Sequence, residues 1–505
     1  MPSFSQEMFV SMLALTGAVI VVSALLSGLV ERSGLPQVIV FLALGALIGP
    51  AGLALLDAGV NSPVLRVVAT LSLVLVLFTD AVSLDIREVR QHRLLAALVL
   101  GPGTLASAAL IAAAGWWILD LTPGMAAILG AALASTDPVL LRGLLRRPGL
   151  DPGVRQALRL ESGLNDAVLL PIVLVAMAVL SRSSPLTGSE WGKLGLSLLL
   201  LSLAAGVAAG LVGVTALEFV RRRIGVRRDY ESLYSLGVAF AAFAAAEAVH
   251  GSGFLAAFAA GLTIAALDVE LCDCFLEYGE TTAEMALLFT FVLFGASLIW
   301  SGLGVVSAST LLFTGAVLLL RPLAFLPALS LARGLSWRNR ALIAWFGPRG
   351  LSSLLLVLLP VFAGVPGTEQ LLPVCCLVVL VSILVHGFSP IVLLRNRPDS
   401  ASSAGTQNLA GTSFENTGAE RAAAVKGAAQ TVARLADPEY IEISELLELQ
   451  RAGEPVVVVD ARSDRTFNDS ELLAQGTVRI TPDRGVLEAE RHNLPRGAVL
   501  AVFCA

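Results

Sequence analysis

Apolar blocks of about twenty residues recur along most of this 505-residue chain. The hydrocarbon core of a bilayer is about 30 Å thick, so a helix of that length can cross it. Only 14% of the residues are charged, whereas a soluble domain carries about a quarter. The pattern predicts an all-α polytopic membrane protein with about thirteen transmembrane helices. The predicted spans are residues 8–30, 37–56, 64–83, 94–118, 123–145, 157–180, 194–220, 230–249, 252–267, 283–300, 303–326, 338–361 and 370–394.

Arginines in alternate loops predict the orientation. They cluster within residues 87–93, 146–155, 221–228, 333–340 and 395–397. Because loops rich in Lys and Arg stay in the cytoplasm, the N-terminus is expected outside and the C-terminus inside a plasma or inner membrane. The stretch MPSFSQEMFV lacks the positively charged start of a cleaved signal, so the first block is expected to remain as a span. The net charge of −5 argues against a nucleic-acid-binding surface.

The composition divides the chain into three parts. Residues 1–398 form the predicted transmembrane domain, and residues 399–436, rich in Ser, Gly, Asn and Thr, read as a flexible linker. Residues 437–505 show a soluble α/β pattern, with a helix at ISELLELQRAG and strands at PVVVVDAR and AVLAVFCA. We expect this last part to be a small cytoplasmic domain.

Proline interrupts two of the predicted spans. In LASTDPVLL, Pro138 lacks the N–H of a regular helix, so the fifth span should open near Asp137. In IAWFGPRGLSSLL, two glycines and Pro348 break the twelfth span around Arg349. The two spans lie seven apart and therefore cross the membrane in opposite directions. Oppositely directed interrupted helices are typical of secondary transporters with inverted repeats.

The sixth span begins with an unusually polar face. Glu161 and Asn165 are four residues apart, as are Ser162 and Asp166, so the four side chains form two adjacent rows. Ionisable residues inside a membrane commonly mark ion or proton paths. Together with Asp137, this face offers only oxygen ligands, which suit a hard cation such as an alkali ion. A carboxylate that binds either the cation or a proton makes an antiporter.

Glu161 needs a cationic partner, because a second permanent anion in this region would be costly. Arg349, at the break of the twelfth span, is the predicted partner. We interpret Glu161–Arg349 as a structural ion pair that joins the two repeats rather than as a part of the transport step.

Several motifs over residues 1–395 resemble the monovalent cation:proton antiporter family, on its sodium/proton exchanger branch. They are STDPV, LESGLNDAVLLP, HGSGFLAAFAAGL, FVLFGASL, RPLAF and WFGPRGLSSLLL. The resemblance implies a core of two three-helix inverted repeats, a dimerisation domain and an elevator-like motion, hence a homodimer. It implies exchange of Na⁺, and of Li⁺, for H⁺ without a cofactor. The Asn-Asp pair implies an electroneutral one-for-one exchange.

The same resemblance places the ion site on residues of this chain. It would comprise Asp166, Asp137, Thr136 and Ser162, with Asn165 alongside. The acid that often follows Leu-Phe in the third span of the family is replaced here by Thr79, and Asp80 stands one place later as an accessory candidate. A K⁺/H⁺ exchanger of the same architecture is the alternative, since the same oxygens can hold either ion.

The C-terminal part resembles a portion of a rhodanese domain. VVVVDARSDRTF is similar to its first strand and Asp-x-Arg, and AVLAVFCA is similar to the strand that leads to its cysteine. Cys504 would then be the catalytic sulfur carrier. This gives a second alternative, a membrane-anchored sulfurtransferase. Thirteen spans with buried acids exceed what an anchor requires, so we expect a transporter rather than an enzyme.

Overall fold

The computed structural model describes residues 37–393 apart from gaps at 51, 55–58, 85, 146–149, 183–186, 224–227, 268–272 and 333–334. Towards the C-terminus it describes residues 455–461, 477–480 and 499–503, and a few single residues elsewhere. The chain divides into two compact units, residues 1–400 and 401–505. The division into a domain, a linker and a second domain stays a prediction.

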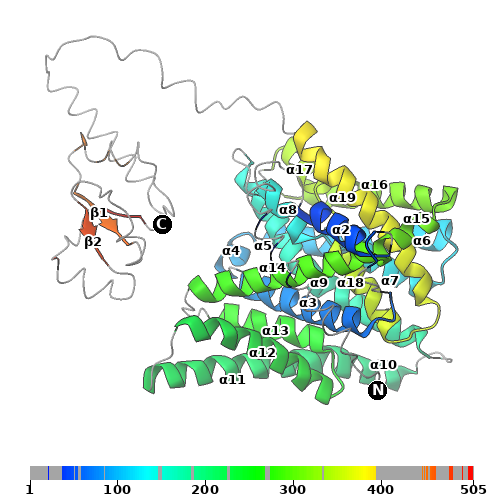
Figure 1. The fold of residues 1–505 in the computed structure, drawn as a ribbon, viewed down its shortest axis with the longest axis horizontal. Coiled ribbons are helices and arrows are strands. Elements are labelled where there is room, and N and C mark those ends of the chain that lie inside the picture. Colours follow the sequence, from blue (N-terminus) through cyan, green and yellow to red (C-terminus); the bar gives the residue numbers. More distant parts are fainter. Residues whose placement is uncertain are drawn as a thin grey trace, which may run out of the picture. The chain divides into compact units, whose positions relative to one another are not determined.

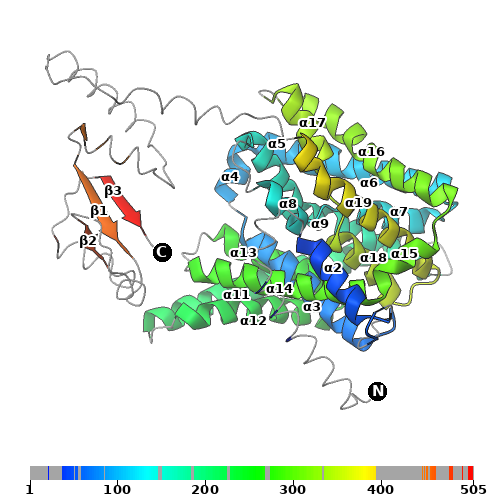
Figure 2. The ribbon, with the colours of Figure 1, turned by 45° about the horizontal axis from the view of Figure 1, so that its top comes forward.

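The first unit is helical, as predicted, and its helices form two groups (Figures 1 and 2). In the first group, α13 packs on α3, α11 and α12, and α14 packs on α2 and α3. The bounds of this group are α2 Gln37–Ile48, α3 Pro63–Val82, α10 Gly188–Gly195, a π-helical turn Leu196–Leu201, α11 Ser202–Arg223, α12 Arg228–Ala248, α13 Gly253–Ala266 and α14 Asp273–Ala296.

The second group holds the interrupted helices. Here α7 packs between α6, α9 and α18, and α16 packs on α6 and α17. Its bounds are α4 Ile86–Gln91, α5 Arg93–Leu98, a π-helical segment Val99–Leu105, α6 Ala106–Ile118, α7 Pro123–Ala134, α8 Pro138–Leu145, α9 Pro152–Leu180, α16 Ala308–Ser330, α17 Trp337–Trp345, α18 Leu351–Phe362 and α19 Leu371–Leu393. Short turns Leu298–Trp300, α15 Ser301–Gly304 and Thr368–Gln370 connect the helices around them.

Proline starts several of these helices. Pro63, Pro123 and Pro152 each stand at the first turn of a helix, where a missing N–H leaves no hydrogen bond unmade. Glycine lets helices of the first group approach closely: a Cβ on Gly261 of α13 would collide with the backbone of Phe78 on α3. Close packing of small residues is how helices associate where no water drives them together.

The described helices agree with the predicted spans. Seven helices are long and apolar enough to cross a membrane, a bent pair, 285–296 and 298–304, could form another, and four shorter apolar helices accompany them. Every predicted block from residue 37 onward coincides with an apolar helix or a broken pair. The first block, 8–30, lies outside the described residues except for single positions.

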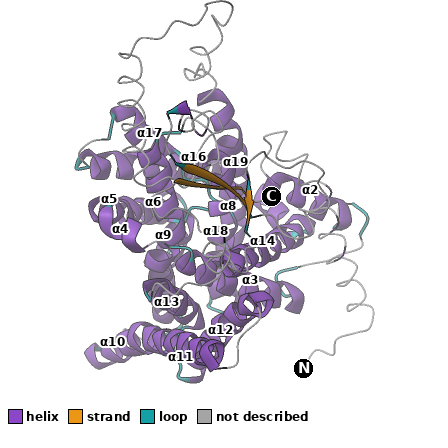
Figure 3. Ribbon diagram, turned by 90° about the vertical axis from the view of Figure 1, so that its left-hand side faces the viewer, coloured by secondary structure: helices purple, strands orange, loops and turns teal. Residues whose placement is uncertain are grey.

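The second unit contains a three-stranded parallel sheet in the order β2-β1-β3 (strands in Figure 3). The strands are β1 Val456–Asp460, β2 Val478–Arg479 and β3 Val499–Phe503, with Val459 opposite Val478 and Val456 opposite Val499. The two strands predicted from PVVVVDAR and AVLAVFCA are confirmed. The predicted helix lies mostly outside the described residues, and Cys504 lies outside them.

Candidate functional site

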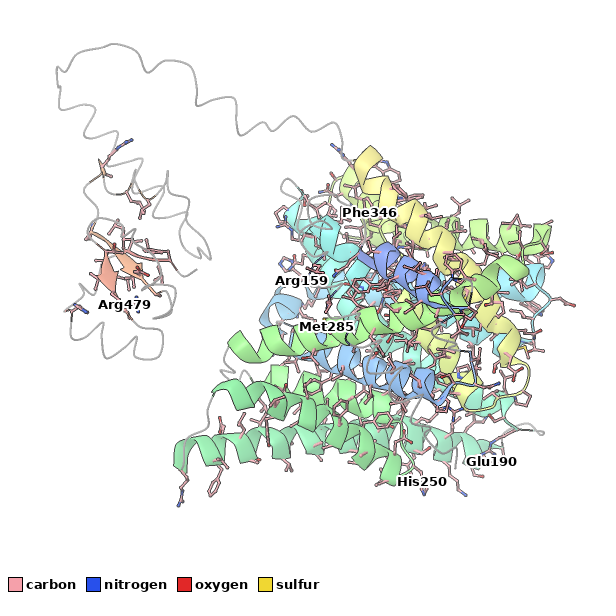
Figure 4. All side chains as sticks on the ribbon, in the orientation of Figure 1. Arg159, Glu190, His250, Met285, Phe346 and Arg479 are labelled. Carbon is pink, nitrogen blue, oxygen red and sulfur yellow. The ribbon has the colours of Figure 1, made fainter. Side chains whose placement is uncertain are left out.

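The two predicted helix breaks exist, and they touch. α7 ends at Ala134 and α8 begins at Pro138, and α17 ends at Trp345 and α18 begins at Leu351. Phe346, labelled in Figure 4, is the first residue of the second break. The breaks are joined directly, because the Asp137 N–H donates to the Pro348 carbonyl oxygen at 3.0 Å. Two segments more than two hundred residues apart in the chain therefore form one buried crossing.

Asp137 binds the N-terminal ends of two helices at this crossing. Its Oδ1 accepts from the N–H of Val139, at 2.8 Å, in the first turn of α8. Its Oδ2 accepts from the N–H of Leu351, at 2.6 Å, at the start of α18. The positive end of each helix dipole faces the carboxylate, which stabilises its negative charge. Gly350 leaves the necessary room, since a Cβ there would collide with the Asp137 carboxylate.

Two arginines bind the carbonyl groups that the breaks leave unpaired. Arg349 Nη1 donates to the carbonyl oxygens of Ala134 and Ser135, at 3.0 and 3.3 Å, at the end of α7. Arg321 Nη2, from α16, donates to Ile343 and Phe346, at 3.1 and 3.3 Å, at the end of α17. A cation at a helix C-terminus is favoured by the dipole. At both breaks, charged side chains thus bind the unpaired backbone groups. Asp137 accepts from the N-terminal ends of α8 and α18, Arg349 donates to the C-terminal end of α7, and Arg321 donates to that of α17.

The predicted partner of Glu161 was wrong. Glu161 is fully buried on α9 and pairs with Arg321, which holds both of its carboxylate oxygens through two nitrogens, Nη2 at 2.7 Å and Nη1. Arg321 is itself buried and stacks over the Phe325 ring, 4.1 Å from its centroid. Arg349 is instead engaged by the carbonyl oxygens at the end of α7. Glu161 does form a buried ion pair, as expected, but its partner is Arg321 and not Arg349.

Side chains of helix α19 bind backbone groups on both sides of the second break. The Arg349 N–H donates to Ser382 Oγ at 2.7 Å, and Ser382 Oγ lies 3.2 Å from His386 Nδ1. His386 Nε2 lies 3.2 Å from the Trp345 carbonyl oxygen. His386 Nδ1 also lies 3.1 Å from the Ser382 carbonyl oxygen, so each ring nitrogen faces a backbone carbonyl oxygen, one of α19 and one of α17. The opened backbone on both sides of the break therefore has partners on one neighbouring helix.

Asp166 faces the crossing from α9. It is buried, and the Ser135 hydroxyl donates to its Oδ1 at 2.5 Å. Ser352, from α18, lies near the same carboxylate, and Asp137 is its neighbouring anion. Asp166 therefore faces residues of both broken spans and is bound by the Ser135 hydroxyl.

Asn165 and Ser162 behave differently from each other. Asn165 Nδ2 donates to Thr136, to its Oγ1 at 2.6 Å and its carbonyl oxygen at 3.2 Å, which fixes the amide orientation because a carbonyl can only accept. Among the described residues, Asn165 Oδ1 has no hydrogen-bond partner although it is buried. Ser162 is also buried, but its hydroxyl donates at 3.4 Å to the Arg159 carbonyl oxygen of its own helix.

Most of the predicted site residues thus meet at one place. Thr136, Asp137, Asn165 and Asp166 surround the crossing, whereas Asp80 lies half-buried on α3. Sequence reasoning interprets Arg321 as structural without pairing it with Glu161, and it missed Ser135 and Ser352. The arginine had a signal, a lone charge within the apolar eleventh span, but the two serines looked like ordinary small residues of membrane helices.

The arrangement defines a class of protein. Two oppositely directed broken helices, a buried carboxylate between them and ligands that are all oxygen are typical of secondary transporters for cations. In the described part of the chain, no cluster of three His, Cys, Asp or Glu side chains could hold a metal cofactor. Residues 19–395 match the family described as sodium/hydrogen exchanger, transmembrane, and the chain belongs to this family.

Individual relatives and one solved structure agree with this assignment. The K⁺/H⁺ antiporter NhaP of Alkalimonas amylolytica is 26% identical over 381 residues, which cover 74% of this chain and 64% of the relative. The Na⁺/H⁺ antiporter NhaH of Halobacillus dabanensis is 28% identical over 302 residues, 57% of this chain and 72% of the relative. The sodium proton antiporter MjNhaP1 of Methanocaldococcus jannaschii superposes with a TM-score of 0.62 at 19% identity, covering 77% of this chain and 99% of that one.

Proposed function

We propose that this chain is a secondary active antiporter that exchanges Na⁺, and Li⁺, for H⁺ by alternating access, and that it is not an enzyme. The observation that carries the proposal is Asp166, a buried carboxylate to which the neutral Ser135 hydroxyl donates. Glu161, by contrast, is paired with Arg321. Asp166 is therefore the acid that can bind a cation and a proton in turn, because either one neutralises it.

A count of charges around the crossing supports a one-for-one exchange. Glu161 and Arg321 cancel, and Asp137 and Arg349 cancel, so an ionised Asp166 leaves one net negative charge. One bound Na⁺ or one bound proton neutralises that charge equally. The state with Na⁺ bound and the state with a proton bound then carry the same charge. In the empty state the Asp166 carboxylate has no counter-charge, and such an anion is costly to move through lipid. Such a carrier exchanges one Na⁺ for one proton without moving net charge.

A K⁺/H⁺ exchanger is the second candidate, and the names of relatives favour it. NhaP of Alkalimonas amylolytica and NhaP2 of several Shewanella strains are K⁺/H⁺ antiporters, whereas NhaH is a Na⁺/H⁺ antiporter. The chain spans less than two thirds of the length of the K⁺/H⁺ relatives. Hydroxyl, amide, carbonyl and carboxylate oxygens are hard ligands that serve both ions.

Proton flux in proteoliposomes under Na⁺, Li⁺ and K⁺ gradients at several pH values tests the proposal. We expect flux with Na⁺ and Li⁺, and its absence in Asp166→Asn, with protein level and melting temperature unchanged. Flux with K⁺ alone would replace the first candidate with the second. Wild-type flux in Asp166→Asn would refute the assignment of Asp166.

We further propose an outside N-terminus, a cytoplasmic C-terminus and a homodimer. The arginine-rich loops support the orientation, and accessibility of single introduced cysteines in intact cells tests it. The rhodanese-like reading, with Cys504 as sulfur carrier, stays a prediction. A thiosulfate sulfur-transfer assay on wild type and Cys504→Ala separates it from transport, because ion exchange should be the same in both.

A further inference from the structure

We propose that Ser382 of α19 determines how well the transport site distinguishes one alkali cation from another. Ser382 is not among the predicted ion ligands. It acts as a positioning residue, because it holds the backbone of the second helix break, and that backbone in turn fixes the first break. The inference rests on the proposed function and deepens it, since it concerns the choice of cation at the same site.

The second break, residues 346–350, has a sequence that leaves its backbone free. Gly347 and Gly350 stand within it, and glycine has no Cβ to restrict the backbone torsions. Neither glycine is replaceable without a shift, because a Cβ on Gly347 would collide with Arg321 and one on Gly350 with Asp137. The geometry of this segment is therefore set by its partners rather than by its own torsional preferences.

Ser382 anchors this segment at Arg349. Its Oγ accepts from the Arg349 N–H at 2.7 Å, and both residues are buried. No helix supplies a carbonyl oxygen for this N–H, because Arg349 precedes the first residue of α18, Leu351. Without the hydroxyl the N–H would be left unpaired in a buried place, which is costly. The hydroxyl therefore fixes the backbone of Arg349.

Ser382 belongs to a row of polar side chains on α19. Ser382, His386 and Ser389 are four and three residues apart and therefore share one face of the helix. His386 Nε2 lies 3.2 Å from the Trp345 carbonyl oxygen at the end of α17, whereas Ser389 Oγ accepts from the Trp345 indole N–H at 3.3 Å. The first two members of the row thus bind backbone at the break, and the third binds a side chain beside it.

The backbone that Ser382 holds is also the backbone that positions the first break. The Pro348 carbonyl oxygen accepts from the Asp137 N–H at 3.0 Å, and the Leu351 N–H donates to Asp137 Oδ2 at 2.6 Å. Arg349 lies between these two contacts in the chain, and its guanidinium donates to the end of α7. The predicted ion ligands of the first break therefore take their position from a segment that Ser382 anchors.

A rigid set of ligands is what selects one alkali cation over another. These ions carry the same charge and differ in radius, so a site distinguishes them by the distances at which it holds its oxygen ligands. If the Arg349 N–H loses its partner, the break shifts to find another, and the first break shifts with it. Loosened ligands adapt to either ion, so discrimination falls. A mere loss of folded protein, by contrast, lowers the maximal rate for both ions alike.

The test measures the apparent KM for Na⁺ and for K⁺ in proteoliposomes, at one pH, and compares their ratio between variants. In Ser382→Ala we expect the ratio to move towards one by about fivefold or more, because the loss of a buried hydrogen bond changes an equilibrium constant by about that factor. If Ser382→Ala does not fold, Ser382→Cys keeps the volume and offers only a weak acceptor, so it should show the same shift.

Two other serines are the matched controls. Ser389→Ala removes a hydroxyl from the same face of α19, but one that binds an indole N–H and not the backbone of the break. Ser72→Ala removes an equally buried hydroxyl, which bonds Thr290 at 2.8 Å between α3 and α14. Both variants should keep the KM ratio of the unmutated protein, even where their melting temperatures fall.

An unchanged ratio in a Ser382 variant that still exchanges ions would overturn the inference, and so would an equal change in either control. A ratio near one in the unmutated protein would also overturn it, because there would be no discrimination to lose. If the unmutated protein shows no cation-driven proton flux at all, the proposed function itself fails.

Discussion

The ion pair of Glu161 and Arg321 should dominate the stability of the membrane unit. Arg321→Ala leaves a fully buried carboxylate without its counter-charge and removes a donor from two carbonyl oxygens at the end of α17. Breaking a buried pair by removing one partner costs about 3–5 kcal/mol. For a protein of this size, that lowers the melting temperature by on the order of 5 °C.

Glu161→Ala should cost less than Arg321→Ala. The arginine that remains keeps its carbonyl acceptors, Ile343 and Phe346, and the face of Phe325, so its charge is partly compensated. In the double variant no unpaired charge is left, and we expect a coupling of about 2 kcal/mol or more between the two changes.

Thermal unfolding in detergent, followed for both single variants and the double variant, measures this coupling. The matched control is the double-mutant cycle of Glu161→Ala with Arg349→Ala. The Arg349 guanidinium donates to carbonyl oxygens at the end of α7 and not to the Glu161 carboxylate. Its coupling should be clearly smaller. Additive losses in the Arg321 cycle, or an equal coupling in the Arg349 cycle, would refute the assigned pair.

Three further predictions concern the crossing and the start of α10. Gly350→Ala should abolish exchange, because its Cβ would displace the Asp137 carboxylate, whereas Gly163→Ala, with open space around it on α9, should retain the wild-type rate. Asp137→Asn should lower stability in detergent by about 1–2 kcal/mol, since the anion at two helix N-termini is lost; an unchanged melting temperature would contradict this. Hydrogen bonds from the backbone and side chain of Thr187 lower the pKa of Glu190 from 4.5 to about 2. Its stabilising effect is present above pH 4.5 and is lost as the pH falls towards about 2, so the melting-temperature difference between wild type and Glu190→Gln should shrink over that range.

Much of the crossing could be predicted from local chemistry. Pro138 removes a backbone donor and Gly350 allows close approach, so both breaks follow from residue types. The spacing of Glu161, Asn165 and Asp166 on one helix face follows from helix geometry alone. The order of apolar blocks likewise sets the number and position of the helices, because each must satisfy its own backbone in lipid.

The partner of Glu161 could not be predicted this way. Two buried arginines, Arg321 and Arg349, were available, and helix periodicity does not show which neighbour a face meets. A broken helix leaves carbonyl groups without donors, and these compete with carboxylates for arginine. That rule would have assigned Arg349 to the end of α7. It would not have found Ser135 and Ser352, whose role depends on how the two breaks cross in space.

The proposed one-for-one exchange requires that Asp166 alone takes up and releases a proton during the cycle. Transport in liposomes clamped with potassium and valinomycin at different voltages tests it most directly. The predicted result is Na⁺-driven proton movement with no steady-state current and a rate that does not depend on voltage. A steady-state current carried by the unmutated protein would contradict the claim, and would show that a second acid, Asp137 or Asp80, also titrates.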